Sequence, residues 1–171
     1  MTLIHTALQS EAQSIIEYYK LKKDTSLDIK VYSNKNILVL VSGMGKENTQ
    51  NSLIKIFNKY SILKALNIGI AGCNDKSHNI GDIFCTNKEL ENINHIELKT
   101  VDKAQSFNDA NTSTLYDMEA NYFEEECLKH LDKKDIYVFK VISDYLDDTI
   151  PNKEFVKQLI KKNIKSLEKW I

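Results

Sequence analysis

The segment Asn36-Ile-Leu-Val-Leu-Val-Ser-Gly-Met-Gly45 is the strongest indication of the fold, because its unbroken aliphatic run is followed at once by two closely spaced glycines. Strands buried on both faces of a sheet carry such continuous runs, whereas half-buried strands alternate apolar and polar residues. The glycines then open a helix that ends near Ser61, on which apolar residues recur at helical spacing. These residues are Leu53, Ile56, Phe57 and Tyr60. A buried strand followed by an amphipathic helix is the repeating unit of proteins with a parallel sheet.

The same alternation of strands and helices extends to both sides of this stretch. Further strands are predicted at residues 3–7, 28–32, 65–70, 81–86 and 136–142. Helices are predicted from Ser10, over 117–131 and after Pro151, which is the only proline. The polar segment between Asn87 and Thr114 offers one short strand, 96–101. We therefore predict an α/β fold, a three-layer α/β/α sandwich with a mixed, mostly parallel central sheet, formed by residues 1–171 as a single domain.

Composition excludes several classes of function. The chain has 171 residues, of which 42% are hydrophobic and 27% charged, and this balance is typical of a globular protein. A formal net charge of -1 argues against a general nucleic-acid binder. All 23 basic residues are lysines, so an anion has to be bound by lysine or by backbone N–H groups instead of a guanidinium fork.

The cysteines and histidines give no sign of a metal or of a disulfide framework. Cys73, Cys85 and Cys127 form no C-x-x-C pair, which favours reduced thiols in the cytoplasm. The four histidines show no ligand spacing, so we expect neither a metal nor a cofactor. The N-terminus lacks the pattern of a signal peptide, and no stretch reaches the roughly 18 apolar residues of a membrane span. We expect a soluble, cytoplasmic protein that does not bind membranes.

Polar side chains at the carboxyl ends of the predicted strands are the candidates for function, because ligands of open α/β sheets bind there. They lie in the segments Gln9–Glu11, Ser42–Asn48, Asp117–Glu119 and Ser143–Asp144. Each segment has a structural alternative: Ser10 and Glu11 suit a helix N-terminus, and Asp144 suits a turn. The glycine turn matches neither of the common nucleotide-binding loop motifs, so a nucleotide loop is not predicted.

Taken together, these segments resemble the nucleoside phosphorylase and nucleosidase superfamily, above all the methylthioadenosine/S-adenosylhomocysteine nucleosidases. The resemblance lies in the order and spacing of motifs, of which D-M-E and I-S-D are the most specific. The matching pieces are Ala7–Glu11, Val41–Asn48, Asn67–Gly72 with Gly81–Ile83, Asp117–Ala120 and Val141–Asp144. Only 87–115 is left without a confident match.

The resemblance implies cleavage of the N-glycosidic bond of a purine nucleoside or thionucleoside. Asp144 would then be the general acid that protonates the leaving purine, with Ser143 orienting it. Glu11 would bind and deprotonate the attacking water, so that two carboxyl groups divide the acid and base work. Glu119 would bind the ribose hydroxyls while Met118 packs against the sugar. The floor of the sugar site would be formed by Gly43, Met44 and Gly45.

The chain also departs from the pattern of the superfamily. Its phosphorylases hold phosphate with arginines, which are absent here, so hydrolysis is favoured over phosphorolysis. The segment 87–115 is shorter than in typical nucleosidases, which leaves the base and the nucleoside unspecified. Phe107 is a candidate to stack on the purine, or else it is an apolar residue under a loop. Ile70 and Cys73 stand where the family prefers small polar or glycine residues, which indicates a divergent branch.

The resemblance further implies a homodimer with a small-molecule nucleoside substrate. Two alternatives stay open: a divergent nucleoside-binding protein with little or no catalysis, and a phosphorylase. Retention of Glu11, Glu119 and Asp144 together favours the enzyme.

Overall fold

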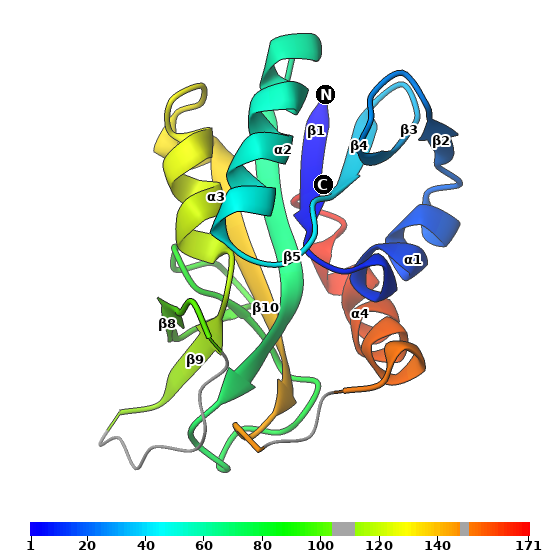
Figure 1. The fold of residues 1–171 in the computed structure, drawn as a ribbon. Coiled ribbons are helices and arrows are strands. Elements are labelled where there is room, and N and C mark those ends of the chain that lie inside the picture. The colour runs from blue at the N-terminus through cyan, green and yellow to red at the C-terminus, as the bar shows by residue number, and fades with distance from the viewer. Residues whose placement is uncertain (104–111, 148–150) are drawn as a thin grey trace.

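The fold is built on one sheet, seen nearly edge-on in Figure 1. The computed structural model describes residues 1–103, 112–147 and 151–171. The strands follow the order β2-β3-β4-β1-β5-β10-β6-β7, with β9 pairing β5 and β8 pairing β9. Their bounds are β1 Thr2–Thr6, β2 Lys22–Asp24, β3 Lys30–Ser33, β4 Ile37–Val41, β5 Lys64–Cys73, β6 Ile83–Cys85, β7 Asn94–His95, β8 Glu97–Thr100, β9 Thr114–Asp117 and β10 Ile136–Asp144.

The four central strands β4, β1, β5 and β10 are parallel, so their carboxyl ends meet at one edge of the sheet. Antiparallel pairs flank them: β3 joins β4, and β6 joins β10. The aliphatic run of β4 is buried along its whole length, as its sequence predicts. The mixed, mostly parallel sheet predicted from the sequence is confirmed.

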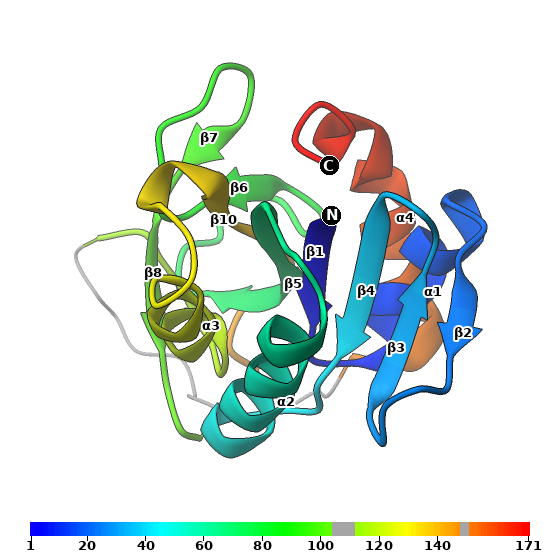
Figure 2. The same ribbon diagram turned by 90° about the horizontal axis from the view of Figure 1, so that it is seen from above.

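Helices cover both faces of this sheet (Figure 2). One face carries α1 (Gln9–Tyr18) and α4 (Lys153–Leu167), and the other carries α2 (Lys46–Lys59) and α3 (Ala120–Cys127). Each face has its own apolar core because successive strand residues point to opposite sides. On β1, for example, Ile4 packs with α1 and α4, whereas Leu3 packs with α2 and α3. The three-layer sandwich is confirmed by these two cores.

The predicted helix over 117–131 is wrong at both ends. The helix α3 begins at Ala120, because 114–117 is drawn into the strand β9, whose Leu115 pairs with Cys73 of β5. The Asp117 carboxylate then accepts a hydrogen bond from the Ala120 N–H at 2.8 Å, which satisfies a free donor of the first helical turn. The chain leaves the helix after Cys127.

Two strands also run farther than predicted. The strand β5 continues to Cys73 and β10 continues to Asp144, and Asp144 pairs with Gly72 across a register shift. Asp144 is therefore held at the end of a paired strand and does not lie in a free loop. In the described residues, no helix is long and apolar enough to cross a membrane.

Candidate active site

Glu11 is a buried carboxyl group that joins the first turn of α1 to β5. Its Oε2 accepts hydrogen bonds from the N–H groups of Ala7 at 3.0 Å and Leu8 at 2.8 Å, and its Oε1 accepts one from Ile70 at 2.9 Å. Burial raises the pKa of Glu11 above its ordinary value, although these N–H groups and Lys140 oppose the rise. The helix-capping role considered from the sequence is therefore present, and the same carboxyl group also reaches the centre of the sheet.

A buried ion pair that the sequence analysis overlooked lies next to Glu11. The Lys140 ammonium of β10 is 2.7 Å from Asp117 Oδ2 of β9, and the two side chains are 2% and 1% exposed. Burial by itself would lower the pKa of Lys140, but Asp117, Glu119 and Glu11 raise it above its ordinary value. Burial would raise the pKa of Asp117, yet Lys140 lowers it below its ordinary value. Both groups are thus charged inside the protein.

Glu119 lies between this ion pair and the glycine turn that precedes α2. Its Oε1 accepts a hydrogen bond from the Gly45 N–H at 2.8 Å. Burial raises the pKa of Glu119 to about 7, although Lys140 and the Gly45 N–H oppose the rise. Glu119 therefore titrates near neutral pH, and it links the D-M-E motif to the glycine turn. Met118 beside it is half-buried, and Met44 in the turn is 56% exposed.

His5 is a second residue that sequence reasoning missed, since histidines were considered only as metal ligands. The Asn67 amide Nδ2 donates to His5 Nδ1 at 2.7 Å, which leaves His5 Nε2 to donate to Ser42 Oγ at 2.8 Å. Ser42 Oγ in turn donates to the Gly43 carbonyl at 2.7 Å. Burial, followed by the charge of Lys140, lowers the pKa of His5 to about 3. A neutral histidine thus anchors the glycine turn to the core.

Asp144 occupies the carboxyl end of β10. Its Oδ2 accepts a hydrogen bond from the Ser143 hydroxyl at 2.6 Å, and its Oδ1 accepts one from the Leu146 N–H at 3.0 Å. The side chain is half-buried, so it remains open to a ligand. The bond to Leu146 is the turn contact that the sequence also allowed. The contacts of Asp144 are thus compatible with either prediction from the sequence, a general acid oriented by Ser143 or a turn residue bound to Leu146.

Two glycines of β5 give these carboxyl groups their room. A Cβ on Gly69 would lie 2.8 Å from Glu11 Oε1, and a Cβ on Gly72 would lie 2.9 Å from Asp144 Oδ1. Glu11 and Asp144 thus contact the same strand three residues apart. That Glu11, Glu119 and Asp144 face one cleft stays a prediction, and Phe107 lies outside the described residues. The described residues hold no cluster of three or more histidine, cysteine or acidic side chains suited to a metal ion.

Comparisons with known proteins place this fold. No protein-family model matches the chain, and no curated protein matches its sequence. Solved structures do match. Futalosine hydrolase of Helicobacter pylori aligns with a TM-score of 0.79 and 16% identity, over 99% of this chain and 96% of that chain.

Two nucleosidases give similar values. The 5′-methylthioadenosine/S-adenosylhomocysteine nucleosidase from Helicobacter pylori, bound to butyl-thio-DADMe-Immucillin-A, aligns with a TM-score of 0.79 and 16% identity, over 99% and 96% of the two chains. The Streptococcus pneumoniae MTA/SAH nucleosidase, in complex with 8-aminoadenine, aligns with a TM-score of 0.81 and 14% identity, over 99% and 97%. The resemblance inferred from the sequence is confirmed at the level of the fold.

The buried ion pair predicts a coupling in stability. Lys140→Met leaves the Asp117 carboxylate buried without its counter-charge and should lower the free energy of unfolding by about 3–5 kcal/mol. Asp117→Asn alone should destabilise the protein less, because Glu11 and Glu119 still face Lys140. The double variant should lose clearly less than the sum of the two losses. Urea denaturation at pH 7 measures all three, with the exposed Lys161→Met as the control; additive losses would contradict the coupling.

The shifted pKa values of Glu119 and His5 predict opposing effects of pH on the free energy of unfolding. Between pH 4.5 and 6.5, folded Glu119 holds a proton that the unfolded chain has released, so its contribution to stability falls as the pH rises. In the same window the unfolded chain protonates His5 and the folded protein does not, so this contribution rises with pH. Glu119→Gln should therefore steepen the rise of stability with pH, by up to about 1.4 kcal/mol per pH unit relative to the parent. Parallel curves for parent and variant in denaturation from pH 5 to 6.5 would refute the assignment.

Proposed function

We propose that this protein hydrolyses the N-glycosidic bond of a purine nucleoside or thionucleoside. The observation that carries the proposal is the set of acidic groups at the carboxyl edge of the parallel strands, with Glu11 and Glu119 buried around Lys140. Ligands of open α/β sheets bind at this edge. The fold shared with nucleosidases and futalosine hydrolase supports the same conclusion.

Asp144 would be the general acid. When the bond between C1′ of the sugar and the purine nitrogen breaks, its electron pair goes to the purine, which takes a proton from the Asp144 carboxyl group. The Ser143 hydroxyl at 2.6 Å fixes one carboxyl oxygen, and the Leu146 N–H fixes the other. An acid held in this way delivers its proton without first losing side-chain freedom.

Glu11 would activate the water that attacks C1′. A carboxylate has about four lone-pair positions, and backbone N–H groups use three of those on Glu11. The remaining position is free to accept a proton from water. Because burial raises the pKa of Glu11, its carboxylate is a stronger base than an exposed glutamate.

Glu119 would bind the ribose and favour its transition state. Its Oε1 is held by the Gly45 N–H, while Oε2 accepts no hydrogen bond from the described residues and can accept from ribose hydroxyls. Its negative charge would stabilise the positive charge that develops on the sugar. Met118 would pack against the sugar, and Gly43, Met44 and Gly45 would form the floor. The purine-stacking role of Phe107 belongs to the same proposal.

Asp144→Asn tests the assignment of the acid. Asparagine keeps the size and the turn contact with Leu146, but it holds no acidic proton for the leaving base. Turnover should fall by about 10² to 10⁴, while nucleoside affinity stays close to the parental value. Release of the base by the variant at the parental rate would remove Asp144 from the mechanism. The exposed Asp132→Asn serves as the matched control.

A panel of nucleosides, beginning with methylthioadenosine and assayed with and without phosphate, separates the alternatives. Release of base without phosphate supports hydrolysis, and release that requires phosphate identifies a phosphorylase. Binding without release would favour the nucleoside-binding alternative.

The proposal includes a homodimer, which the resemblance implies. Light scattering should give twice the monomer mass at micromolar concentration. A monomer mass would refute this part of the proposal.

A further inference from the structure

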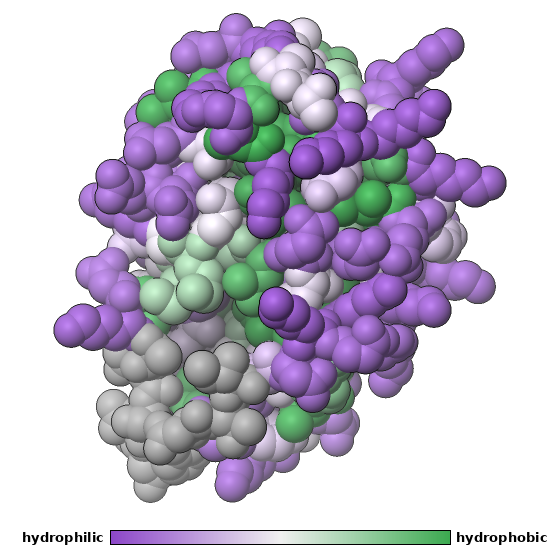
Figure 3. All heavy atoms as spheres, turned by 45° about the vertical axis from the view of Figure 1, so that its right-hand side comes forward, coloured by the Kyte–Doolittle hydropathy of each residue, from purple (hydrophilic) through white to green (hydrophobic). Residues whose placement is uncertain are grey.

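His5 is a polar side chain in the interior of the sheet. Hydrophilic side chains cover most of the face drawn in Figure 3, whereas His5 is 0% exposed. It lies on β1, which runs between β4 and β5. A buried polar group is unfavourable unless its hydrogen bonds are satisfied. The proposed reaction gives this side chain no part, so its place in the fold calls for an explanation of its own.

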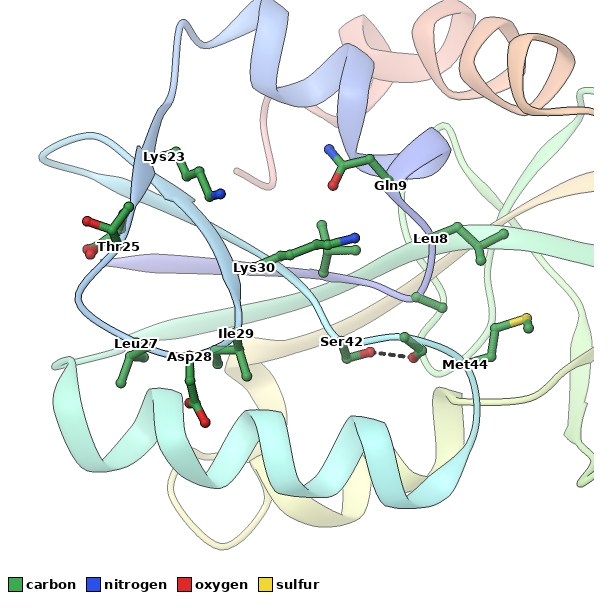
Figure 4. A pocket seen from close by; sticks show the side chains of 14 residues that line it. Leu8, Gln9, Lys23, Thr25, Leu27, Asp28, Ile29, Lys30, Ser42 and Met44 are labelled. Atoms are coloured by element: carbon green, nitrogen blue, oxygen red, sulfur yellow. Dashed lines mark hydrogen bonds between the residues drawn. The ribbon is translucent and has the colours of Figure 1, made fainter.

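Through its ring nitrogen Nε2, His5 restrains the turn that follows β4. Nε2 donates to Ser42 Oγ at 2.8 Å, and the Ser42 hydroxyl donates to the Gly43 carbonyl at 2.7 Å, a bond drawn as a dashed line in Figure 4. Gly43 and Gly45 have left-handed backbone angles, with φ of +91° and +84°. Glycine adopts such angles without strain but also leaves the chain flexible. The two hydrogen bonds therefore fix a turn that its own residues do not make rigid.

Through the face of its ring, His5 also contacts the helix that begins directly after Glu119. The rings of His5 and Phe123 are stacked, with their centroids 5.4 Å apart and their planes inclined by 23°. The Phe123 N–H donates to the Glu119 carbonyl at 2.9 Å, within the first turn of α3. Phe123 is 0% exposed, so close packing holds the start of this helix against the imidazole ring.

The two segments that His5 contacts meet in a single hydrogen bond. The Gly45 N–H of the turn donates to Glu119 Oε1 at 2.8 Å. Because donor and acceptor belong to different segments, this bond depends on how the turn and the start of α3 are placed relative to each other. One buried side chain of the central strand β1 contacts both segments.

We propose that His5 is a positioning residue of the ribose site, which keeps the Gly45 N–H and the Glu119 carboxylate at hydrogen-bonding distance. It acts through Ser42 and Phe123 and does not contact the substrate. The inference rests on the proposed function, because it takes Glu119 to bind the ribose. A displacement of about 1 Å in such a group can reduce turnover about 10²-fold, so a rigid support has a catalytic effect.

A neutral imidazole suits this task. Burial, followed by the charge of Lys140, lowers the pKa of His5 to about 3. His5 therefore keeps the same hydrogen bonds throughout the pH range in which Glu119 titrates, and it adds no charge to the buried acidic groups around Lys140.

The first test is the titration of Glu119 in the protein without substrate. NMR of its carboxyl carbon follows the titration, and the signal is assigned by its loss in Glu119→Gln. Ser42→Ala removes the hydroxyl that joins His5 to the turn. Because the Gly45 N–H lowers the pKa of Glu119, loosening this bond should raise the midpoint from about 7 by roughly 0.5 to 1 pH unit.

The other groups that act on this titration stay in place in the variant. Lys140 lowers the pKa of Glu119, whereas Asp117 and Glu11 raise it. None of the three is replaced, so a change in the midpoint reports on the turn.

The second test is turnover of a nucleoside that the parent cleaves. Ser42→Ala should lower kcat by roughly 10- to 100-fold and change KM by less, because the charge of Glu119 acts mainly in the transition state. Ser42→Thr keeps the hydroxyl and should restore both the midpoint and kcat. Ser52→Ala, which removes a buried hydroxyl of α2 outside the turn, is the matched control and should change neither.

His5→Phe separates the two contacts of the ring. It keeps an aromatic ring to stack on Phe123 but cannot bind Ser42, so it should raise the Glu119 midpoint as Ser42→Ala does. The double variant should give no further rise, because both changes act through one hydrogen bond. Should His5→Phe fail to fold, Ser42→Ala decides the question, since Ser42 is only partly buried.

A parental midpoint in Ser42→Ala would overturn the inference, and so would a raised midpoint with parental kcat. Loss of thermal stability without either change would identify His5 as a purely structural anchor and would overturn the inference as well. The titration needs no substrate. If the parent cleaves no nucleoside, a raised midpoint in Ser42→Ala still supports the positioning of Glu119 by His5, and the proposed function alone fails.

Discussion

The buried ammonium of Lys140 is the interaction on which the candidate site depends. It lies 2.7 Å from Asp117 and acts on the pKa of Glu119 and Glu11, so one positive charge offsets several acidic groups in the interior. Without it, those carboxyl groups would have to stay protonated or be exposed to water, because an isolated buried charge is strongly unfavourable. The ion pair also joins β10 to β9, two strands that do not pair with each other directly. The same ion pair therefore compensates the buried acidic groups and connects β10 to β9.

Much of this arrangement could be predicted from the sequence, because it follows from local patterns. The aliphatic run of β4 and the acids at the strand ends identified the sheet and placed Glu11, Glu119 and Asp144 at candidate positions. The strand β9 could not be predicted, because 114–117 is extended through its pairing with β8 and with β5, and its partners on β5 lie about 40 residues earlier in the chain. Lys140 was visible as a lone charge inside the apolar run 136–142, but its partner became apparent only once β9 was placed.

His5 shows a similar limit. A histidine inside a short buried strand has several ordinary explanations, and spacing argued only against a metal. Its role depends on Asn67 of β5 and on Ser42, the residue that directly follows β4; β5 and β4 are the two neighbours of β1 in the sheet. Such a relay has no signature in the sequence, since each of its members is separated from the others by tens of residues. The contacts of His5 with Asn67 and Ser42 bring several strands together, so only the structure shows them.

The position of Glu119 connects this constraint to the proposed chemistry. Its pKa of about 7 means that protonated and ionised forms coexist at neutral pH, with Lys140 favouring the ionised form against burial. A positive charge that develops on a bound sugar would act in the same direction as Lys140 and draw Glu119 toward its ionised form. Because the Gly45 N–H already holds one oxygen, this change requires no movement of the side chain. A carboxyl group poised between its two states, and fixed in place, is suited to respond to charge on the substrate when that charge appears.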